Sequence, residues 1–184
     1  MLGAFLIRHT EEHTMTMSMS AASLPVMKHM LGNLSHFLDK GAAFAEARKF
    51  EAANLLNSRL APDMLPLIVQ VYIACDAAKN GAARIAGIEP PKFEDKKDAS
   101  FAELKERIQK TIDYLASIAP EELDGTEAKD VTFPVGKETR TMKAENYLKL
   151  WVLPNMFFHV TTAYAILRHN GVELGKRDYL AGAS

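Results

Sequence analysis

Apolar residues recur every three or four positions in several long stretches of the chain, which is the spacing of one face of an α-helix. The first stretch starts at Ser23, a helix-capping residue type, has Pro25 in its first turn and ends at Gly41. Its apolar positions are Leu24, Met27, Leu31, Leu34 and Leu38. The pattern therefore predicts a first amphipathic helix over residues 23–41.

The opposite face of this predicted helix is polar and carries two histidines. His29 and His36 are seven residues apart, so they share a face, which lies opposite the leucine stripe at about 100° per residue. Asn33 and Lys40 lie on the same face. We interpret this face as solvated; the alternative is a site for a metal or a partner.

A short Ala-rich helical piece is predicted in residues 42–60, followed by a second long helix from Pro62 to about Ala86, before Gly87. The second helix has a predicted core stripe, with Lys79 and Asn80 at its flanks. The stripe consists of Leu65, Val69, Tyr72, Asp76 and Ala83. Asp76 is the unusual member, because a buried carboxylate is costly unless it is paired or ligates a metal.

A charged loop with two prolines, residues 88–99, precedes the third long helix. Ser100 and Glu103 have the spacing of a capping box, and the apolar pattern predicts a helix from Phe101 to about Ile118, with Arg107 beside its stripe. Residues 130–142 alternate around a Gly-Lys turn. This alternation predicts a small, exposed β-hairpin before the last helix.

The last helical region begins near Ala144 and contains Pro154, which is expected to kink or divide it, because proline has no backbone N–H. After Pro154 the helix is apolar on nearly every side up to Gly171, and a tail follows. A helix that is apolar all round is covered all round. We therefore expect a homodimer on the long helices, unless the hairpin covers the second stripe. The large apolar residues behind this expectation are Leu148, Trp151, Phe157 and Phe158.

Composition narrows the classes of protein and partner. The 184 residues are 48% hydrophobic and 24% charged, which suits one globular domain with a sizeable core. The 22 basic and 23 acidic residues give a net charge of -1, so neither nucleic acid nor a membrane is expected as a partner. The single cysteine, Cys75, excludes an intrachain disulfide and favours a cytoplasmic location.

Residues 1–20 carry no helical pattern, and we interpret them as a loose N-terminal arm or an over-long start, with residues 21–184 as the single domain. The arm contains His9-Thr10-Glu11-Glu12-His13, which matches the H-x-x-E-H string of zinc peptidases. That chemistry needs both histidines on one buried helix face together with further ligands. We therefore interpret the string as part of a polar tail.

Four long helices with an insertion before the last resemble the DinB/YfiT-like superfamily. The cue is Leu167-Arg168-His169-Asn170-Gly171, which is similar to the Leu-Arg-x-x-Gly ending of its last helix. The segments Ala74–Lys79, Phe158–Tyr164 and Leu167–Val172 resemble the DUF1993 branch more closely, and the resemblance covers residues 20–182. It implies an all-α, up-down-down-up four-helix bundle with a short extra helix and the hairpin.

The resemblance also implies a metal site of three histidines, one on the second long helix and two on the last. Counting back from Arg168 places His159 at the second histidine of the last helix and Asn155 at the first. The second long helix has no histidine, although Asp76 or Gln70 would supply an oxygen. An Asp76/Asn155/His159 set for a divalent metal would be weak for zinc, because an amide is a poor ligand beside imidazole.

Three interpretations of His159 follow: a hydrogen-bonded core histidine, a proton-transfer or ligand-binding group, or a metal ligand. Asp76 is either a buried ion-pair partner, for which Arg107 and Lys79 are suitable cations, or part of a functional site. The first functional hypothesis is a small-ligand-binding protein that has lost the metal triad. It keeps a polar pocket made of Asp76, Arg107, His159, Tyr72 and Lys79. The second is a metal-dependent transferase that acts through a thiol cofactor, as the superfamily implies.

Overall fold

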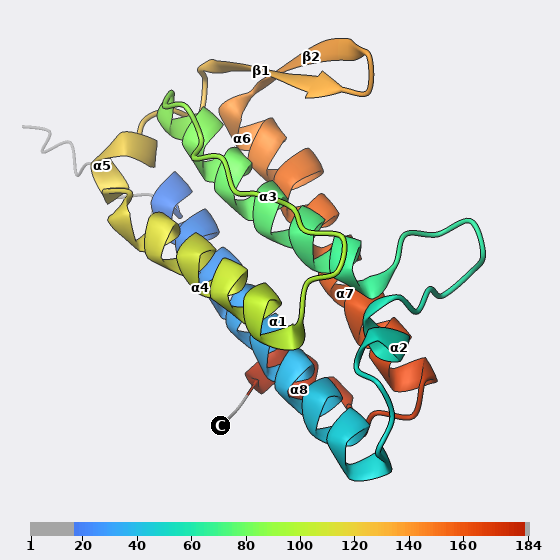
Figure 1. Cartoon of the computed structure of the whole chain (residues 1–184). Helices are drawn as coiled ribbons and strands as arrows, with labels where there is room; N and C mark the ends of the chain where they lie inside the picture. Colours follow the sequence, from blue (N-terminus) through green and yellow to red (C-terminus); the bar gives the residue numbers. More distant parts are fainter. Residues whose placement is uncertain (1–16, 183–184) are drawn as a thin grey trace, which may run out of the picture.

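Four long helices pack side by side in the computed structural model, which describes residues 17–182 (Figure 1). They are α1 (Met19–Arg48), α3 (Leu67–Ala86), α4 (Phe101–Ser117) and α7 (Leu153–His169). α1 and α7 run in one direction, and α3 and α4 run in the other (Figure 1). α3 packs against α4 and α7, and α1 packs against the same two helices, so the bundle is a closed ring. The predicted up-down-down-up arrangement is confirmed.

The parallel direction of α3 and α4 forces the chain to return along the length of the bundle between them. Residues 88–99, the predicted charged loop, make this return as an extended segment that lies along α3 (Figure 1). We call residues 88–99 the return loop. It connects two neighbouring helices that no short turn could join.

α1 is longer than predicted at both ends. The hydroxyl of Ser18, not that of Ser23, caps its N-terminus by accepting from the backbone N–H of Ala21, and Ser23 is buried inside the helix. Gly41 does not end the helix but lies inside it. A Cβ atom at this position would come within 3.1–3.2 Å of Leu167 and Phe101. It is a close-packing glycine, and the helix ends at Lys49 in a left-handed conformation (φ 55°).

The boundary between arm and domain also differs from the prediction. Met19 and Ser20, which were assigned to the arm, belong to α1, and Met19 is buried. The backbone N–H and hydroxyl of Ser20 both donate to the carboxylate of Asp124, at 2.8 and 3.0 Å. The H-x-x-E-H string and the rest of residues 1–16 lie outside the described residues.

The second long helix begins later than predicted, after Pro66 rather than at Pro62, and the short helix α2 (Ala53–Leu56) precedes it. Leu65 therefore lies outside the helix and is 44% exposed. Two members of the predicted core stripe, Tyr72 and Ala83, are buried, whereas Val69 and Asp76 are only half-buried. The buried residues of α3 that the stripe missed include Leu67, Val71, Ala74, Cys75, Ala78 and Ala82. Lys79, predicted at the flank, is buried, and Asp76 lies at the rim.

α4 begins at the predicted capping box, in which the Glu103 backbone N–H donates to Ser100 Oγ at 3.2 Å and the Ser100 N–H donates to Glu103 Oε2 at 2.8 Å. The one-turn helix α5 (Pro120–Leu123) follows. The predicted hairpin is confirmed as the antiparallel strands β1 (Asp130–Val135) and β2 (Glu138–Lys143). It is less exposed than predicted, since the ring of Phe133 is buried.

The last helical region is divided just before Pro154, as predicted. α6 (Ala144–Tyr147) leads into a π-helical turn, η1 (Leu148–Val152), in which the Leu153 N–H bonds to the Leu148 carbonyl. Because Pro154 offers no N–H to the carbonyl four residues earlier, the wider turn absorbs the break in the helical ladder. By length and composition Ala144–His169 would be apolar enough to cross a membrane, but α7 packs against α1 and α3 inside the bundle.

The chain after Gly171 forms a short helix, α8 (Lys176–Ala181), which packs on the polar face of α1. His36 and Lys40 both donate to Asp178 Oδ1, at 2.9 and 3.0 Å, and Asn33 donates to the Tyr179 carbonyl at 2.7 Å. Burial alone would raise the pKa of Asp178, but the hydrogen bonds from the Gly175 N–H, Lys40 and His36 hold it well below its usual range. The interpretation of this face as solvated therefore holds only in part: the tail buries Asn33 and half-buries His36 and Lys40, whereas His29 stays exposed.

The second apolar stripe of the last helical region is covered in part within the chain. Phe133 of the hairpin packs against Tyr147 and Trp151, with ring centroids 4.5 and 5.0 Å apart. Phe157 is half-buried, whereas Phe158 remains 56% exposed. The homodimer stays a prediction.

We expect Gly81 to be essential for the packing of α3 against the π-helical turn. A Cβ atom at this position would lie 2.9 Å from Val152 Cγ2 and closer still to Cγ1. Gly81→Ala should therefore lower the free energy of unfolding by about 1–3 kcal/mol in urea denaturation. Gly32, which has nothing within 4 Å of such an atom, is the control. Gly32→Ala should instead add about 0.5–1 kcal/mol.

The double variant Gly81→Ala/Val152→Ala separates this clash from a general intolerance of the site. With the valine methyl groups removed, it should unfold close to Val152→Ala alone. A Gly81→Ala variant as stable as the parent chain would contradict the described contact.

Candidate functional site

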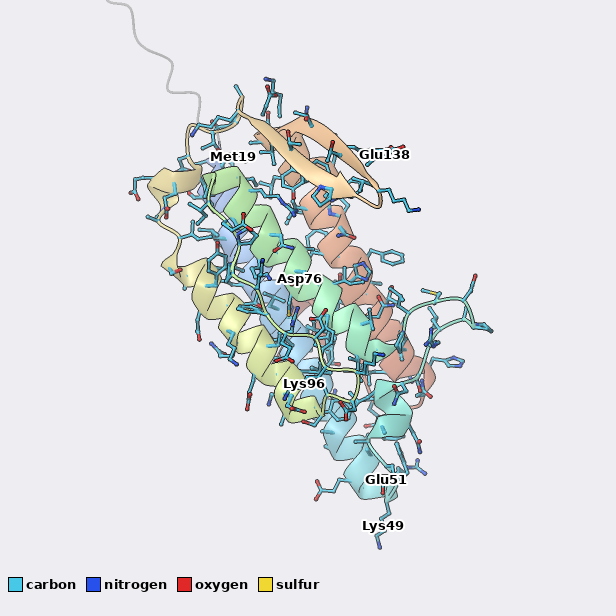
Figure 2. All side chains as sticks on the ribbon, turned by 45° about the horizontal axis from the view of Figure 1, so that its top comes forward. Met19, Lys49, Glu51, Asp76, Lys96 and Glu138 are labelled. Atoms are coloured by element: carbon cyan, nitrogen blue, oxygen red, sulfur yellow. The ribbon has the colours of Figure 1, made fainter. Side chains whose placement is uncertain are left out.

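A buried ion-pair network joins α3 to α4 around Asp76, which Figure 2 shows near the middle of α3. Arg107 Nη2 and Lys79 Nζ both lie 3.1 Å from Asp76 Oδ1, and Arg107 Nη1 lies 2.7 Å from Asp95 Oδ1. The side chains of Lys79 and Arg107 are only 5% and 6% exposed, while that of Asp76 is 35% exposed. Asp76 therefore provides charge compensation at the rim for two cations in the interior.

The same two cations hold the return loop. Lys79 Nζ donates to the Pro91 carbonyl at 2.7 Å and lies 4.6 Å from the centre of the Phe93 ring. Arg107 Nη1 donates to the Glu94 carbonyl at 3.2 Å, and its guanidinium lies 4.4 Å from the centre of the Tyr72 ring. These contacts combine charge-assisted hydrogen bonds with cation–π attraction.

Tyr72 completes the attachment of the loop. Its hydroxyl donates to the Lys96 carbonyl at 2.9 Å and accepts from the Lys96 backbone N–H at 3.1 Å. We call Asp76, Lys79, Arg107 and Tyr72 with their partners on the return loop the loop network. Four of the five predicted pocket residues thus lie together, and Tyr72, Lys79 and Arg107 bind the backbone of the return loop.

His159 lies apart from the loop network. Its Nδ1 is 2.7 Å from Gln70 Oε1. Gln70 uses its amide N–H on the Leu65 carbonyl, at 2.9 Å, so its oxygen accepts and Nδ1 carries the proton. Burial lowers the pKa of the imidazole, which keeps it neutral. The contacts are those of a hydrogen-bonded core histidine between α7 and α3.

A cleft of about 250 Å³ opens between α3, the π-helical turn and the hairpin. It is lined by Ile73, Asp76, Ala77, Asn80, Arg84, Pro134, Tyr147, Trp151, Val152 and Asn155. We call it the α3–α7 cleft. Asp76, Asn80 and Arg84 are four residues apart in sequence, so they form one polar row along α3. The cleft brings Asp76 and Asn155 together, as the sequence suggested, but His159 does not line it.

A second cavity, of about 380 Å³, lies between the return loop and α4. It is lined by Tyr72, Lys92, Phe93, Glu94, Lys96, Glu103, Glu106, Arg107 and Lys110. Lys96 Nζ lies 2.6 Å from Glu103 Oε1 and lowers the pKa of that carboxyl to about 2. Arg107, which also lines this cavity, pairs with Asp76 and Asp95.

Sequence reasoning missed most residues of the cleft. Arg84 was not singled out, Asn80 was placed at a flank, and Trp151 was assigned to core or dimer contacts. One signal was present, since the spacing of Asp76, Asn80 and Arg84 marks one helix face. The residues from the hairpin and the π-helical turn carry no such signal, because the fold alone brings them there.

Comparison with known proteins identifies the family of this chain. The family described as "Domain of unknown function (DUF1993)" matches residues 19–180. The chain belongs to the DUF1993 family. Among solved structures, that of a DinB family member protein from Shewanella denitrificans is 39% identical and superposes with a TM-score of 0.80, covering 88% of this chain and 91% of that one. No curated protein matches the chain.

Membership of DUF1993 and the DinB-like fold raises the question of whether these residues fit a metal. Asp76 Oδ1 already contacts two cationic side chains, which disfavour a divalent cation beside it. The imidazole of His159 is hydrogen-bonded to Gln70 and does not reach the cleft that holds Asn155. Within residues 17–182 no three His, Cys, Asp or Glu side chains are placed to hold a metal. The Asp76/Asn155/His159 set therefore does not fit a metal site.

We expect Asp76→Ala to destabilise the protein, because it removes a charge that compensates both Lys79 and Arg107. Breaking a fully buried pair costs about 3–5 kcal/mol. The partial exposure of Asp76 and the remaining partners of both cations reduce this to about 2 kcal/mol in urea denaturation.

The matched control is Asp39→Ala, which removes the exposed pair between Asp39 and Lys105 and should cost no more than about 0.5 kcal/mol. An Asp76→Ala variant that loses as little as this control would show that the loop network does not stabilise the fold.

Proposed function

We propose that this DUF1993 protein binds a small polar molecule in the α3–α7 cleft. The observation that carries the proposal is a set of polar groups in the cleft left without partners among the described residues. Both cations contact Oδ1 of Asp76, so Oδ2 has no partner there. The side-chain amides of Asn80 and Asn155, both half-buried in the lining of the cleft, likewise have no hydrogen bond within residues 17–182. A ligand that satisfied these groups would gain hydrogen bonds where the chain supplies none.

The walls of the cleft suit a small ligand. Trp151 and Tyr147 provide aromatic surface on the side of the π-helical turn, and Ala77 leaves room on the side of α3. π-helical turns inside α-helices occur frequently at functional sites. The volume of about 250 Å³ is just below the roughly 300–1,000 Å³ of pockets for drug-sized ligands, which favours a molecule of metabolite size.

The loop network supports binding indirectly by fixing Asp76. Two buried cations contact Oδ1 and hold the carboxylate in one position. A carboxylate held in place loses little conformational entropy when a ligand binds it. The other hypothesis from the sequence, a metal-dependent transferase with a thiol cofactor, needs a metal donor set that these residues do not provide.

Trp151 allows a direct test, because it is the single tryptophan of the chain and lines the cleft. We expect its fluorescence to change on titration with members of a panel of small amines, amides, alcohols and carboxylates. Ala77→Phe fills the cleft and should abolish every such response. The control Ala43→Phe adds the same ring at an exposed position on α1 and should leave the responses unchanged.

Two outcomes would contradict the proposal. One is that no probe changes the fluorescence of Trp151. The other is that Ala77→Phe, folded as judged by circular dichroism, responds as the parent chain does.

A further inference from the structure

Arg84 is a cation of the α3–α7 cleft that lacks an acidic partner among the described residues. It lies in the last turn of α3, half-buried, and its Nη1 donates to the Tyr147 hydroxyl at 3.1 Å. The other cations near the cleft, Lys79 and Arg107, are compensated by Asp76. A guanidinium has five N–H donors, so Arg84 keeps most of them for another acceptor.

Tyr147 supplies a second, independent donor at the same place. It lines the cleft, its side chain is almost fully buried, and its oxygen accepts from Arg84. Its hydroxyl proton has no acceptor within residues 17–182. Burial raises the pKa of this phenol although Arg84 beside it acts to lower it, so the group stays a neutral donor. An unused buried donor is unfavourable, and an acceptor on a ligand would satisfy it.

Arg84 and Tyr147 therefore present a cationic and a neutral donor to one point of the cleft. A carboxylate is the acceptor that best matches both donors. Its two oxygens offer several lone-pair sites, and its charge complements the guanidinium. Asp76, at the other end of the polar row on α3, has the opposite character and accepts through Oδ2. Eight residues of helix place the two ends about 12 Å apart at their Cα atoms.

We propose that the ligand of the cleft carries a carboxylate, which Arg84 and Tyr147 bind at the hairpin end, and that its remainder extends past Asn80 and presents a hydrogen-bond donor to Asp76. This inference rests on the proposed function and assigns the chemical class of the molecule that the cleft takes. A small amino carboxylate has both features. The order of the row fixes its orientation, with the carboxylate towards Pro134 of β1 and the amine towards the loop network.

The test compares acids with their own amides. The probes are glycine, β-alanine, 4-aminobutyrate and 5-aminovalerate, each titrated against its carboxamide up to about 10 mM with Trp151 fluorescence as the readout. We expect at least one acid to bind, and its amide to bind at least about tenfold more weakly. The acid with the highest affinity then indicates, by its length, the distance between the two ends of the cleft.

Two variants assign the carboxylate to its residues. Arg84→Gln keeps a donor for Tyr147 but removes the charge. It should lower the affinity for the acid at least about tenfold and leave the affinity for the amide unchanged. Tyr147→Phe removes the hydroxyl and should also weaken the acid; circular dichroism checks that it is folded. Arg168→Gln, at an exposed arginine in the last turn of α7, is the matched control and should not change binding.

Failure of this inference is distinguishable from failure of the proposed function. The carboxylate assignment is overturned if no acid binds, if acid and amide bind equally, or if Arg84→Gln leaves acid binding unchanged. If amines, amides or alcohols then still respond and Ala77→Phe abolishes their binding, the cleft remains a ligand site for another chemical class. If no probe of any class responds, both proposals fall together.

Discussion

The ion pairs of Asp76 with Arg107 and Lys79 resolve the main constraint that the topology imposes on this bundle. Because α3 and α4 are neighbours that run in the same direction, the chain crosses the length of the molecule between them (Figure 1). A loop of charged residues and prolines has no regular hydrogen-bonding pattern of its own. The buried cations provide hydrogen bonds to its carbonyls, and the carboxylate of Asp76 compensates their charge.

The position of Asp76 gives this arrangement a second consequence. Oδ1 of the carboxylate contacts both cations of the loop network, and Asp76 also lines the α3–α7 cleft, so one residue belongs to both features. Burying two cations is expensive unless each is well paired. A site that used the same carboxylate as a metal ligand would remove that compensation. This explains in physical terms why Asp76 does not suit a metal site although the bundle has a DinB-like fold.

Local signals in the sequence predicted those parts of the fold that depend on local interactions. The capping box of α4 and the hairpin turn at Gly136 are made by residues close in sequence, and both predictions were confirmed. The pairing of Asp76 with Arg107 or Lys79 was one of the two interpretations drawn from the sequence, because a buried carboxylate is costly unless it is paired. The segments Ala74–Lys79, Phe158–Tyr164 and Leu167–Val172 together indicated the family, which the comparison confirms.

The remaining errors concern residues whose role is set by distant parts of the chain. Glycine often ends a helix, but Gly41 lies inside α1 where it allows close packing with Leu167 and Phe101. Asparagine is often exposed, but Asn33 is covered by α8. The cleft shows the same limitation. Arg84 and Tyr147 are 63 residues apart, and only the packing of α3 against the last helical region reveals that they share one site.

Hydrogen exchange measured by mass spectrometry tests most directly whether Asp76 holds the return loop in place. In Asp76→Asn the side chain keeps its shape but loses the charge that compensates Lys79 and Arg107. We predict that peptides from residues 88–99, including the Lys96 amide that donates to Tyr72, exchange much faster than in the parent chain, while Asp39→Asn changes nothing there. Unchanged exchange of the return loop in Asp76→Asn would contradict the role of this carboxylate.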